Sequence, residues 1–288
     1  MQGADLCPKW AKNEQGGEIM KFDMHTHTEK CGHAYGAAED YVKTAIDMGM
    51  DVIGISDHCP NFSSSEDHPT PRLKMAVSQF PDYVNEILDL KIKYKHQIEV
   101  LLGIESDFIP GKTDLYDRQY QKYPFDYIIG SVHGIDGHSI FARKEWARMT
   151  KKELTQIKTL FCHYVQQSAR SGAYQILGHI DALKTFIPEY HLLAPETADE
   201  TLKVIKEEEV VIEVNTSGDK KGLSEWFPSI DILERAYHFG VKVTFGSDAH
   251  RPEHLGRDRE KVVETLKMIG YKEWFIFRNK KPVKMKLE

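Results

Sequence analysis

Seven short apolar runs alternate with longer amphipathic stretches along most of this chain. Each run is rich in Val, Ile, Phe or Tyr, and most of the runs end at Gly or Ser. Parallel strands have this composition because other elements cover both of their faces. The runs lie at 21–25, 51–56, 98–105, 125–133, 174–179, 210–215 and 241–248. The alternation predicts a parallel α/β fold, in which helices connect successive strands.

The stretches between the runs have helical periodicity. In 37–49, Tyr41, Val42 and Ala45 share one face, and Gly49 is expected to end the helix. Comparable helices are predicted at 80–95, 151–171, 196–209, 229–239 and 258–269. Seven strand–helix units over roughly 250 residues predict a closed TIM-like barrel, with a doubly wound open sheet as the alternative.

Two segments fall outside this pattern. Residues 1–19 are polar and have no clear period, so they are predicted to form a peripheral N-terminal extension, with 20–288 as one barrel domain. Residues 59–77 form a long loop rich in Ser and Pro. Loops of this length inside a compact domain are usually functional lids or disordered segments.

Potential metal ligands follow six of the seven predicted strands. They are His25, His27 and His33 after the first, His58 after the second, Glu105 after the third, His133 after the fourth, His179 after the fifth, and Asp248 and His250 after the seventh. In a barrel the carboxyl ends of the strands converge on one face, where active sites are built. Nine donors are too many for one ion and suit two or three. Imidazole and carboxylate groups suit Zn, Fe or Mn.

A single histidine after a strand is more often a hydrogen-bonded structural residue than a ligand. Here seven of the 14 histidines fall at these strand ends, and that concentration favours a metal site. The other histidines are expected to be solvated or capping residues. Cys31 and Cys59 lie beside candidate ligands, and we interpret both as small buried or loop residues.

Composition limits the partners. The formal net charge is −6, which argues against a stable nucleic-acid partner and against binding to a membrane surface. The four cysteines form no CxxC pair, which is typical of a reducing compartment. We find neither a signal peptide nor an apolar run of about 18 residues, so a cytoplasmic protein is expected.

The motifs "DMHTHTEKCGH", "GISDH", "GIE", "GSVH", "GHID" and "GSDAH" together resemble the ligand set of the PHP (polymerase and histidinol phosphatase) superfamily. The resemblance covers about residues 21 to 260, in order. The stretches "LLGIESDF" and "EVNTSG" are most similar to the histidinol-phosphate phosphatases of that superfamily. The resemblance implies a distorted (β/α)7 barrel with a trinuclear metal centre.

The resemblance also implies a distribution of ligands. One ion would take His25, His27, Glu105 and Asp248, a second would share Glu105 and take His133 and His179, and a third would take His33, His58 and His250. Glu105 and Asp248 are the expected catalytic ligands. The implied reaction is hydrolysis of a phosphate monoester, L-histidinol phosphate in histidine biosynthesis, by a hydroxide held between two ions that attacks phosphorus in line. Asp248 is one candidate for the acid that protonates the leaving group.

Basic, acidic and aromatic residues near the strand ends are candidates for substrate contacts. Basic residues that follow barrel strands are candidates for the phosphate: Lys184, Lys220, Lys221 and Arg251. Similar phosphatases often use arginines there, and lysine would lose bidentate recognition. Candidates for contacts to the amine and the imidazole are Asp107, Phe108, Asp136 and the loop 59–77.

Two other functions remain open. One is a PHP phosphoesterase that acts on nucleotides, nucleic-acid 5′ ends or phosphotyrosine protein. The other is a non-catalytic module in which the metals only stabilise the fold. The complete set of ligands argues against the second function, and the sequence leaves the oligomeric state open.

Overall fold

The computed structural model describes residues 19–187, 189–218 and 225–287. Its parallel strands form two sheets, in the orders β1-β2-β3 and β10-β9-β8-β5-β4. The strands are β1 (Phe22–Asp23), β2 (Val52–Ile55), β3 (Glu99–Leu102), β4 (Glu105–Asp107), β5 (Ile129–Ser131), β8 (Ile176–Leu177), β9 (Val211–Asn215) and β10 (Val243–Gly246). All seven predicted runs therefore contain parallel strands.

Backbone contacts join the two sheets into a ring. On one side, Met24 N donates to Phe245 O (3.0 Å), which brings the segment after β1 beside β10. On the other side, His58 forms a parallel bridge with Glu105, which connects the end of β2 to β4. This closed arrangement confirms the predicted distorted barrel, and the alternative of an open sheet does not apply.

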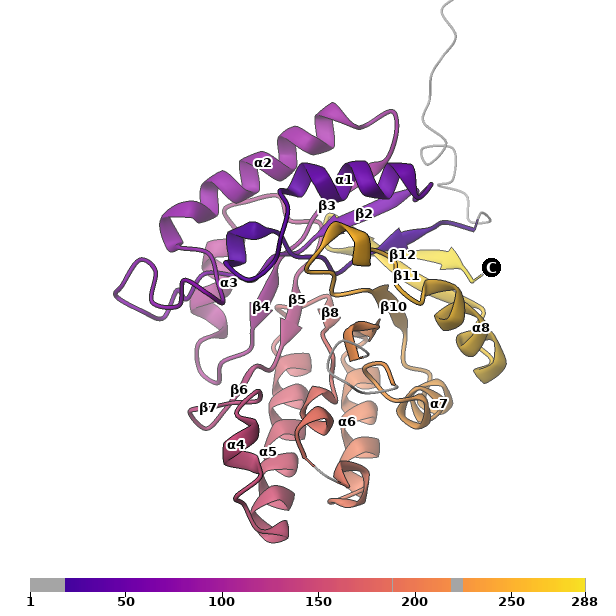
Figure 1. The fold of residues 1–288 in the computed structure, drawn as a ribbon. Helices are drawn as coiled ribbons and strands as arrows, with labels where there is room; N and C mark the ends of the chain where they lie inside the picture. The colour runs from indigo at the N-terminus through magenta and orange to yellow at the C-terminus, as the bar shows by residue number, and fades with distance from the viewer. Residues whose placement is uncertain (1–18, 188, 219–224, 288) are drawn as a thin grey trace, which may run out of the picture.

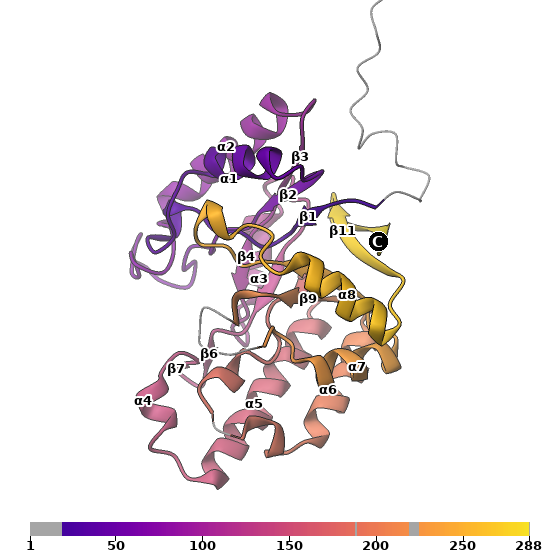
Figure 2. The same ribbon diagram turned by 45° about the vertical axis from the view of Figure 1, so that its right-hand side comes forward.

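The predicted helices are present with nearly the expected limits. They are α1 (Ala38–Asp47), α2 (Phe80–Lys93), α5 (Lys151–Arg170), α6 (Glu196–Glu207), α7 (Ile230–Phe239) and α8 (Arg259–Ile269). Helices α1 and α2 cover one side of the strands, and α5 and α6 lie on the opposite side (Figures 1 and 2). Thr150 caps α5 by accepting from Glu153 N, and the Glu153 side chain accepts from Thr150 N in return.

The structure differs from the sequence prediction in three places. The run 98–105 is two strands, β3 and β4, with different neighbours. Helices α3 (Thr113–Tyr120) and α4 (Arg143–Trp146) and the short hairpin of β6 (Gly134–Ile135) and β7 (His138–Ser139) were not expected. Near the C-terminus, β11 (Glu273–Arg278) and β12 (Lys281–Lys286) form an antiparallel hairpin.

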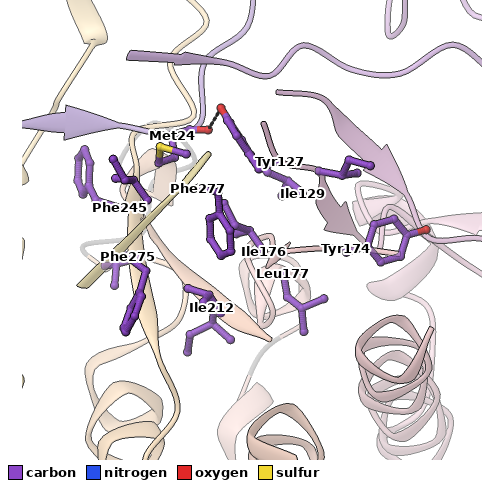
Figure 3. Close-up of a cluster of buried hydrophobic side chains, with 14 of the residues drawn as sticks. Met24, Tyr127, Ile129, Tyr174, Ile176, Leu177, Ile212, Phe245, Phe275 and Phe277 are labelled. Carbon is purple, nitrogen blue, oxygen red and sulfur yellow. Dashed lines mark hydrogen bonds between the residues drawn. The ribbon is translucent and has the colours of Figure 1, made fainter. Parts of the chain in front are cut away.

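The hydrophobic core contains buried side chains of the strands and of the helices that cover them. Figure 3 shows Met24, Tyr127 and Ile176 packed with Phe275 and Phe277 of β11. The Tyr127 hydroxyl donates to Met24 O (2.6 Å), so this buried phenol is satisfied across the barrel. The hairpin thus adds aromatic side chains to the barrel core.

Most of the predicted extension 1–19 lies outside the described residues, so its peripheral position stays a prediction. No helix in the described part of the chain is both long and apolar enough to cross a bilayer.

Candidate metal centre

The structure brings the nine predicted ligands together at the carboxyl ends of the barrel strands. His25 and His27 are fully buried just beyond β1. The other seven line a cavity of about 1000 Å³: His33, His58, Glu105, His133, His179, Asp248 and His250. Because these residues come from six different strand ends, the barrel itself sets their relative positions.

A first group consists of His25, His27, Glu105 and Asp248. His25 Nε2 lies 3.6 Å from Glu105 Oε2 and 4.0 Å from Asp248 Oδ1. His27 Nε2 lies 3.7 Å and 3.1 Å from the same two oxygens. Both Nε2 atoms are buried, and neither forms a hydrogen bond within the described residues. Buried polar atoms rarely lack a partner, so two such nitrogens facing two carboxylates fit a cation site.

A second group is built around the other oxygen of Glu105. Glu105 Oε1 lies 3.1 Å from His179 Nε2 and 3.3 Å from His133 Nε2. The two Nε2 atoms are 3.3 Å apart. Since Oε2 faces the first group and Oε1 the second, Glu105 has the geometry of a carboxylate shared between two ions.

The third predicted group is less compact. The Nε2 atoms of His33 and His250 lie 2.9 Å apart. The ring centroid of His58 is 5.2 Å from that of His33 and 6.0 Å from that of His250. His58 Nδ1 also lies 2.7 Å from Glu105 Oε2. His58 therefore connects the third group to the shared carboxylate.

Three carboxylates that the sequence analysis did not assign to the metal centre stand behind the imidazoles. Glu213 Oε2 lies 2.7 Å from His25 Nδ1, Asp107 Oδ1 lies 2.9 Å from His133 Nδ1, and Asp57 Oδ1 lies 3.5 Å from His27 Nδ1. A carboxylate hydrogen-bonded to Nδ1, as at His25 and His133, fixes the tautomer and leaves the Nε2 lone pair for a metal. An acid inside the apolar run "VVIEVN" was the one available signal for Glu213.

The charges of the ligands suit a cation. Burial raises the pKa of Glu105, but His58 and His133 lower it further, and the net shift is well below the usual value. Burial also raises the pKa of Asp248, which His25 and His27 bring well below the usual value. Both carboxyl groups are therefore ionised at neutral pH.

Several of the imidazoles are neutral. Burial lowers the pKa of His58 to about 4. Burial and the nearby His27 lower the pKa of His250 to about 2. Neutral imidazoles offer a lone pair without displacing a proton, which favours metal binding.

The two cysteines beside the ligands have the environment of protonated thiols. Cys31 is buried, and its Sγ donates to Thr28 O (3.2 Å). Burial raises the pKa of both Cys31 and Cys59. Since the thiolate is the form that binds metals, this supports the interpretation of both residues as structural.

Comparisons with known proteins agree with this geometry. The PHP domain model matches residues 23–217. The chain belongs to the PHP domain family. It is 30% identical over 249 residues to a probable histidinol-phosphatase of Deinococcus radiodurans, covering 86% of this chain and 93% of that protein. It is 28% identical to the histidinol-phosphatase of Bacillus subtilis, covering 85% and 99%.

A solved structure shares the fold of this PHP chain. Histidinol phosphate phosphatase from Lactococcus lactis, crystallised with zinc, L-histidinol and phosphate, superposes with a TM-score of 0.77 at 21% identity. The match covers 92% of this chain and all of that one. This PHP chain is thus a histidinol-phosphatase-like, metal-dependent phosphoesterase.

Lys184 and Arg251, the two described residues among the candidates for phosphate contacts, do not reach the PHP metal centre. Lys184 donates to Trp226 O (2.6 Å), pairs with Asp181 (2.9 Å) and lines a different cavity. The guanidinium of Arg251 lies 3.9 Å from the ring centroid of Tyr35 and does not line the metal cavity. Lys220 and Lys221 lie outside the described residues, so their assignment stays a prediction.

One lysine that the sequence analysis did not single out does reach the metal cavity. Lys74, in the loop 59–77, lines the cavity, and its ammonium pairs with Asp107. Asp107 in turn accepts from His133. The loop therefore contacts the PHP site through a charged pair. Lys74 follows no strand, so the strand-end criterion could not find it.

Proposed function

We propose that this PHP chain hydrolyses L-histidinol phosphate to L-histidinol and phosphate, using two to three divalent metal ions. The proposal rests on the three groups of donors arranged around Glu105 at the floor of the cavity. Two curated relatives that match most of the chain are a probable histidinol-phosphatase and a histidinol-phosphatase, which supports the choice of substrate.

The predicted division of the ligands is compatible with the distances. One ion would be held by His25, His27, Glu105 and Asp248, a second by Glu105, His133 and His179, and a third by His33, His58 and His250. Divalent ions at such a site neutralise charge on phosphoryl oxygens and make water nucleophilic near neutral pH. Zn, Fe and Mn all accept this set of donors.

In this mechanism the carboxylates of the protein orient the imidazole ligands and carry negative charge. Glu213 and Asp107 keep the Nδ1 protons of His25 and His133, which directs both Nε2 atoms into the centre. Asp248 is ionised, so it acts as a ligand or a proton acceptor. That charge state does not suit the role of a leaving-group acid, which the sequence analysis considered for Asp248.

The cavity beyond the metal ligands suits a small cationic, aromatic leaving group. Its walls include the rings of Phe108, Phe141 and Tyr164 and the carboxylate of Asp136. Aromatic faces stack on a planar imidazole, and a carboxylate pairs with an ammonium group. The cavity thus offers complements to both polar parts of histidinol.

A panel of phosphate monoesters tests the proposal. The purified protein is assayed for phosphate release from L-histidinol phosphate, AMP, a 5′-phosphorylated oligonucleotide and a phosphotyrosine peptide. We expect kcat/KM to be highest for L-histidinol phosphate. A kcat/KM more than about tenfold higher for another substrate, a preference of about 1.4 kcal/mol, would overturn the assignment.

Glu105→Ala tests the shared carboxylate in the same assay. We expect this variant to lose most of its activity and to bind at least one ion per chain fewer in metal analysis, because the substitution removes a carboxylate oxygen from two groups of ligands. Glu234→Ala, at an exposed position of α7, is the matched control. Near-native activity and metal content in Glu105→Ala would contradict the shared role.

A further inference from the structure

A second cavity, of about 760 Å³, lies outside the metal centre in the helical layer of the barrel. Its walls come from α5, α6, the start of α7 and residues within 180–187 and 189–191. In Figure 1 the segment that follows β8 runs across α5 and α6. None of the nine candidate ligands lines this cavity. Its volume falls in the range of small-molecule sites, about 300–1,000 Å³.

The first notable group in this cavity is a buried ammonium. Lys158 of α5 is only 3% exposed. Its Nζ donates to Tyr190 O (3.0 Å) and lies 4.5 Å from the centroid of the Tyr190 ring. Lys158 forms no ion pair with a carboxylate in the described part of the chain. Burial lowers its pKa, as expected for a cation without a counter-ion. An anion bound in the cavity would relieve this cost.

The second group is a carboxylate with one unused oxygen. Asp181 is 6% exposed, and its Oδ2 accepts from Ser229 N (2.9 Å) and from the Lys184 ammonium (2.9 Å). Its Oδ1 is buried and accepts no hydrogen bond from any described residue. Leaving a buried acceptor unsatisfied destabilises a structure. A ligand with an N–H donor would satisfy it.

The remaining walls combine apolar and charged side chains. The apolar ones include Ile180, Ile187, Leu202 and Ile232, and the charged ones are Lys184, Glu189, Glu225, Asp231 and Arg235. The apolar walls accommodate a hydrocarbon or aromatic side chain that extends away from the two polar groups. The buried Lys158 and Asp181 together with the apolar walls favour an occupant that combines a carboxylate, a hydrogen-bond donor and an apolar side chain.

We propose that this cavity binds an α-amino acid with an apolar or aromatic side chain, with its carboxylate on Lys158 and its ammonium group on Asp181. The proposal assigns a second small-molecule site, separate from the metal centre. It does not depend on the proposed phosphatase substrate, because binding alone tests it.

Calorimetric titration of the metal-loaded protein provides the test, with L-phenylalanine as the probe. Two analogues each remove one polar group: 3-phenylpropionate lacks the ammonium, and L-phenylalaninamide lacks the carboxylate. Loss of one charged hydrogen bond should weaken binding at least about tenfold for either analogue. Equal affinities for all three compounds would overturn the assignment of Lys158 and Asp181.

Two variants locate the binding. Lys158→Met keeps the apolar part of the side chain and removes the ammonium group, and it should raise the Kd for L-phenylalanine at least about tenfold while the protein stays folded. Lys242→Met is the control, since the Lys242 ammonium pairs with Glu209 and does not line the cavity. An amino acid can also chelate a metal, and binding there would be unchanged in Lys158→Met. Unchanged binding in Lys158→Met would refute the proposal. Absence of any heat of binding up to about 10 mM probe would also refute it, because a Kd above about 10 mM corresponds to less than about 3 kcal/mol of binding free energy.

Discussion

Glu213→Gln should weaken metal binding without changing the shape of the site. Glu213 is fully enclosed in β9, and its two oxygens accept from three donors. Oε2 faces His25 Nδ1 (2.7 Å), while Oε1 accepts from His179 N (2.8 Å) and Asn215 Nδ2 (2.8 Å). A glutamine has one acceptor oxygen. In either orientation of the amide, its NH₂ group must therefore face a donor.

The structure determines which contact should fail. The two donors at Oε1 cannot lose their protons, so the amide oxygen is expected to stay there and the NH₂ group to face His25. His25 Nδ1 must then accept, which moves the imidazole proton to Nε2. Nε2 is the atom that lies 3.6 Å from Glu105, in the first ligand group. Loss of such an orienting carboxylate typically costs about 10–100-fold in metal affinity, or about 1.4–2.7 kcal/mol.

Competition titration measures this cost. Metal-free protein is titrated with Zn²⁺ against a chelating dye, and circular dichroism checks that the variant is folded. We expect one binding event of Glu213→Gln to weaken by about 10–100-fold. Glu234→Gln, at an exposed position of α7, should bind like the parent protein. Affinities within about threefold of the parent at every site would refute the tautomer argument, because about 0.7 kcal/mol is less than one such hydrogen bond.

Three further predictions concern stability. A Cβ at Gly54 would overlap the buried phenol of Tyr127, so Gly54→Ala should lower the free energy of unfolding by about 1–3 kcal/mol in urea denaturation. Gly134→Ala is the control and should change that free energy little, because its Cβ would meet only one atom, at 3.7 Å. Arg278 holds both oxygens of Glu99 (2.6 and 2.7 Å), so Arg278→Ala should cost about 2 kcal/mol and lower Tm; an unchanged Tm would contradict it. Removal of metal by a chelator should lower Tm and abolish activity, and Zn²⁺ should restore both.

The alternation of strands and helices was predictable because buried parallel strands and amphipathic helices have different periods. The division of the third run was not predictable. Residues 99–107 are almost wholly buried, and the sequence is apolar from Val100 to Ile104, across Gly103. The division follows from pairing: Glu99 aligns with Val52 of β2, whereas Glu105 aligns with Ile129 of β5. The change of neighbour depends on tertiary contacts that no local pattern contains.

The C-terminal hairpin was missed for a different reason. Its two strands are joined at Asn279 and Lys280, which both have positive φ. Such a turn usually contains glycine, and here it does not. The hairpin is held from outside itself, because Asp126 Oδ1 accepts from Asn279 N (3.2 Å) and Asp126 O accepts from Lys280 N (2.7 Å). A contact across more than 150 residues has no sequence signal.

The ligand residues and the groups that support them differ in predictability. The ligands follow strand ends, including Glu105, which follows β3 and opens β4. Because a barrel brings strand ends together, the approach of the ligands could be inferred from their order alone. Glu213 lies within a strand and Lys74 within a loop, so neither shares that regularity. Lys184 follows a strand but turns toward Asp181. Position after a strand therefore predicts proximity to the barrel mouth, and it does not predict the direction of a long side chain.

The supporting carboxylates explain why this site requires cations. Burial lowers the pKa of His133, but Glu105 and Asp107 raise it to about 9. Burial likewise lowers the pKa of His25, and Glu213 and Glu105 raise it well above its usual value. In the absence of metal, the carboxylates therefore hold protons on these imidazoles. A divalent ion that displaces those protons satisfies the same buried negative charge and gains the Nε2 lone pairs as ligands. The excess of buried carboxylate thus couples metal binding to proton release and to the stability of the barrel mouth.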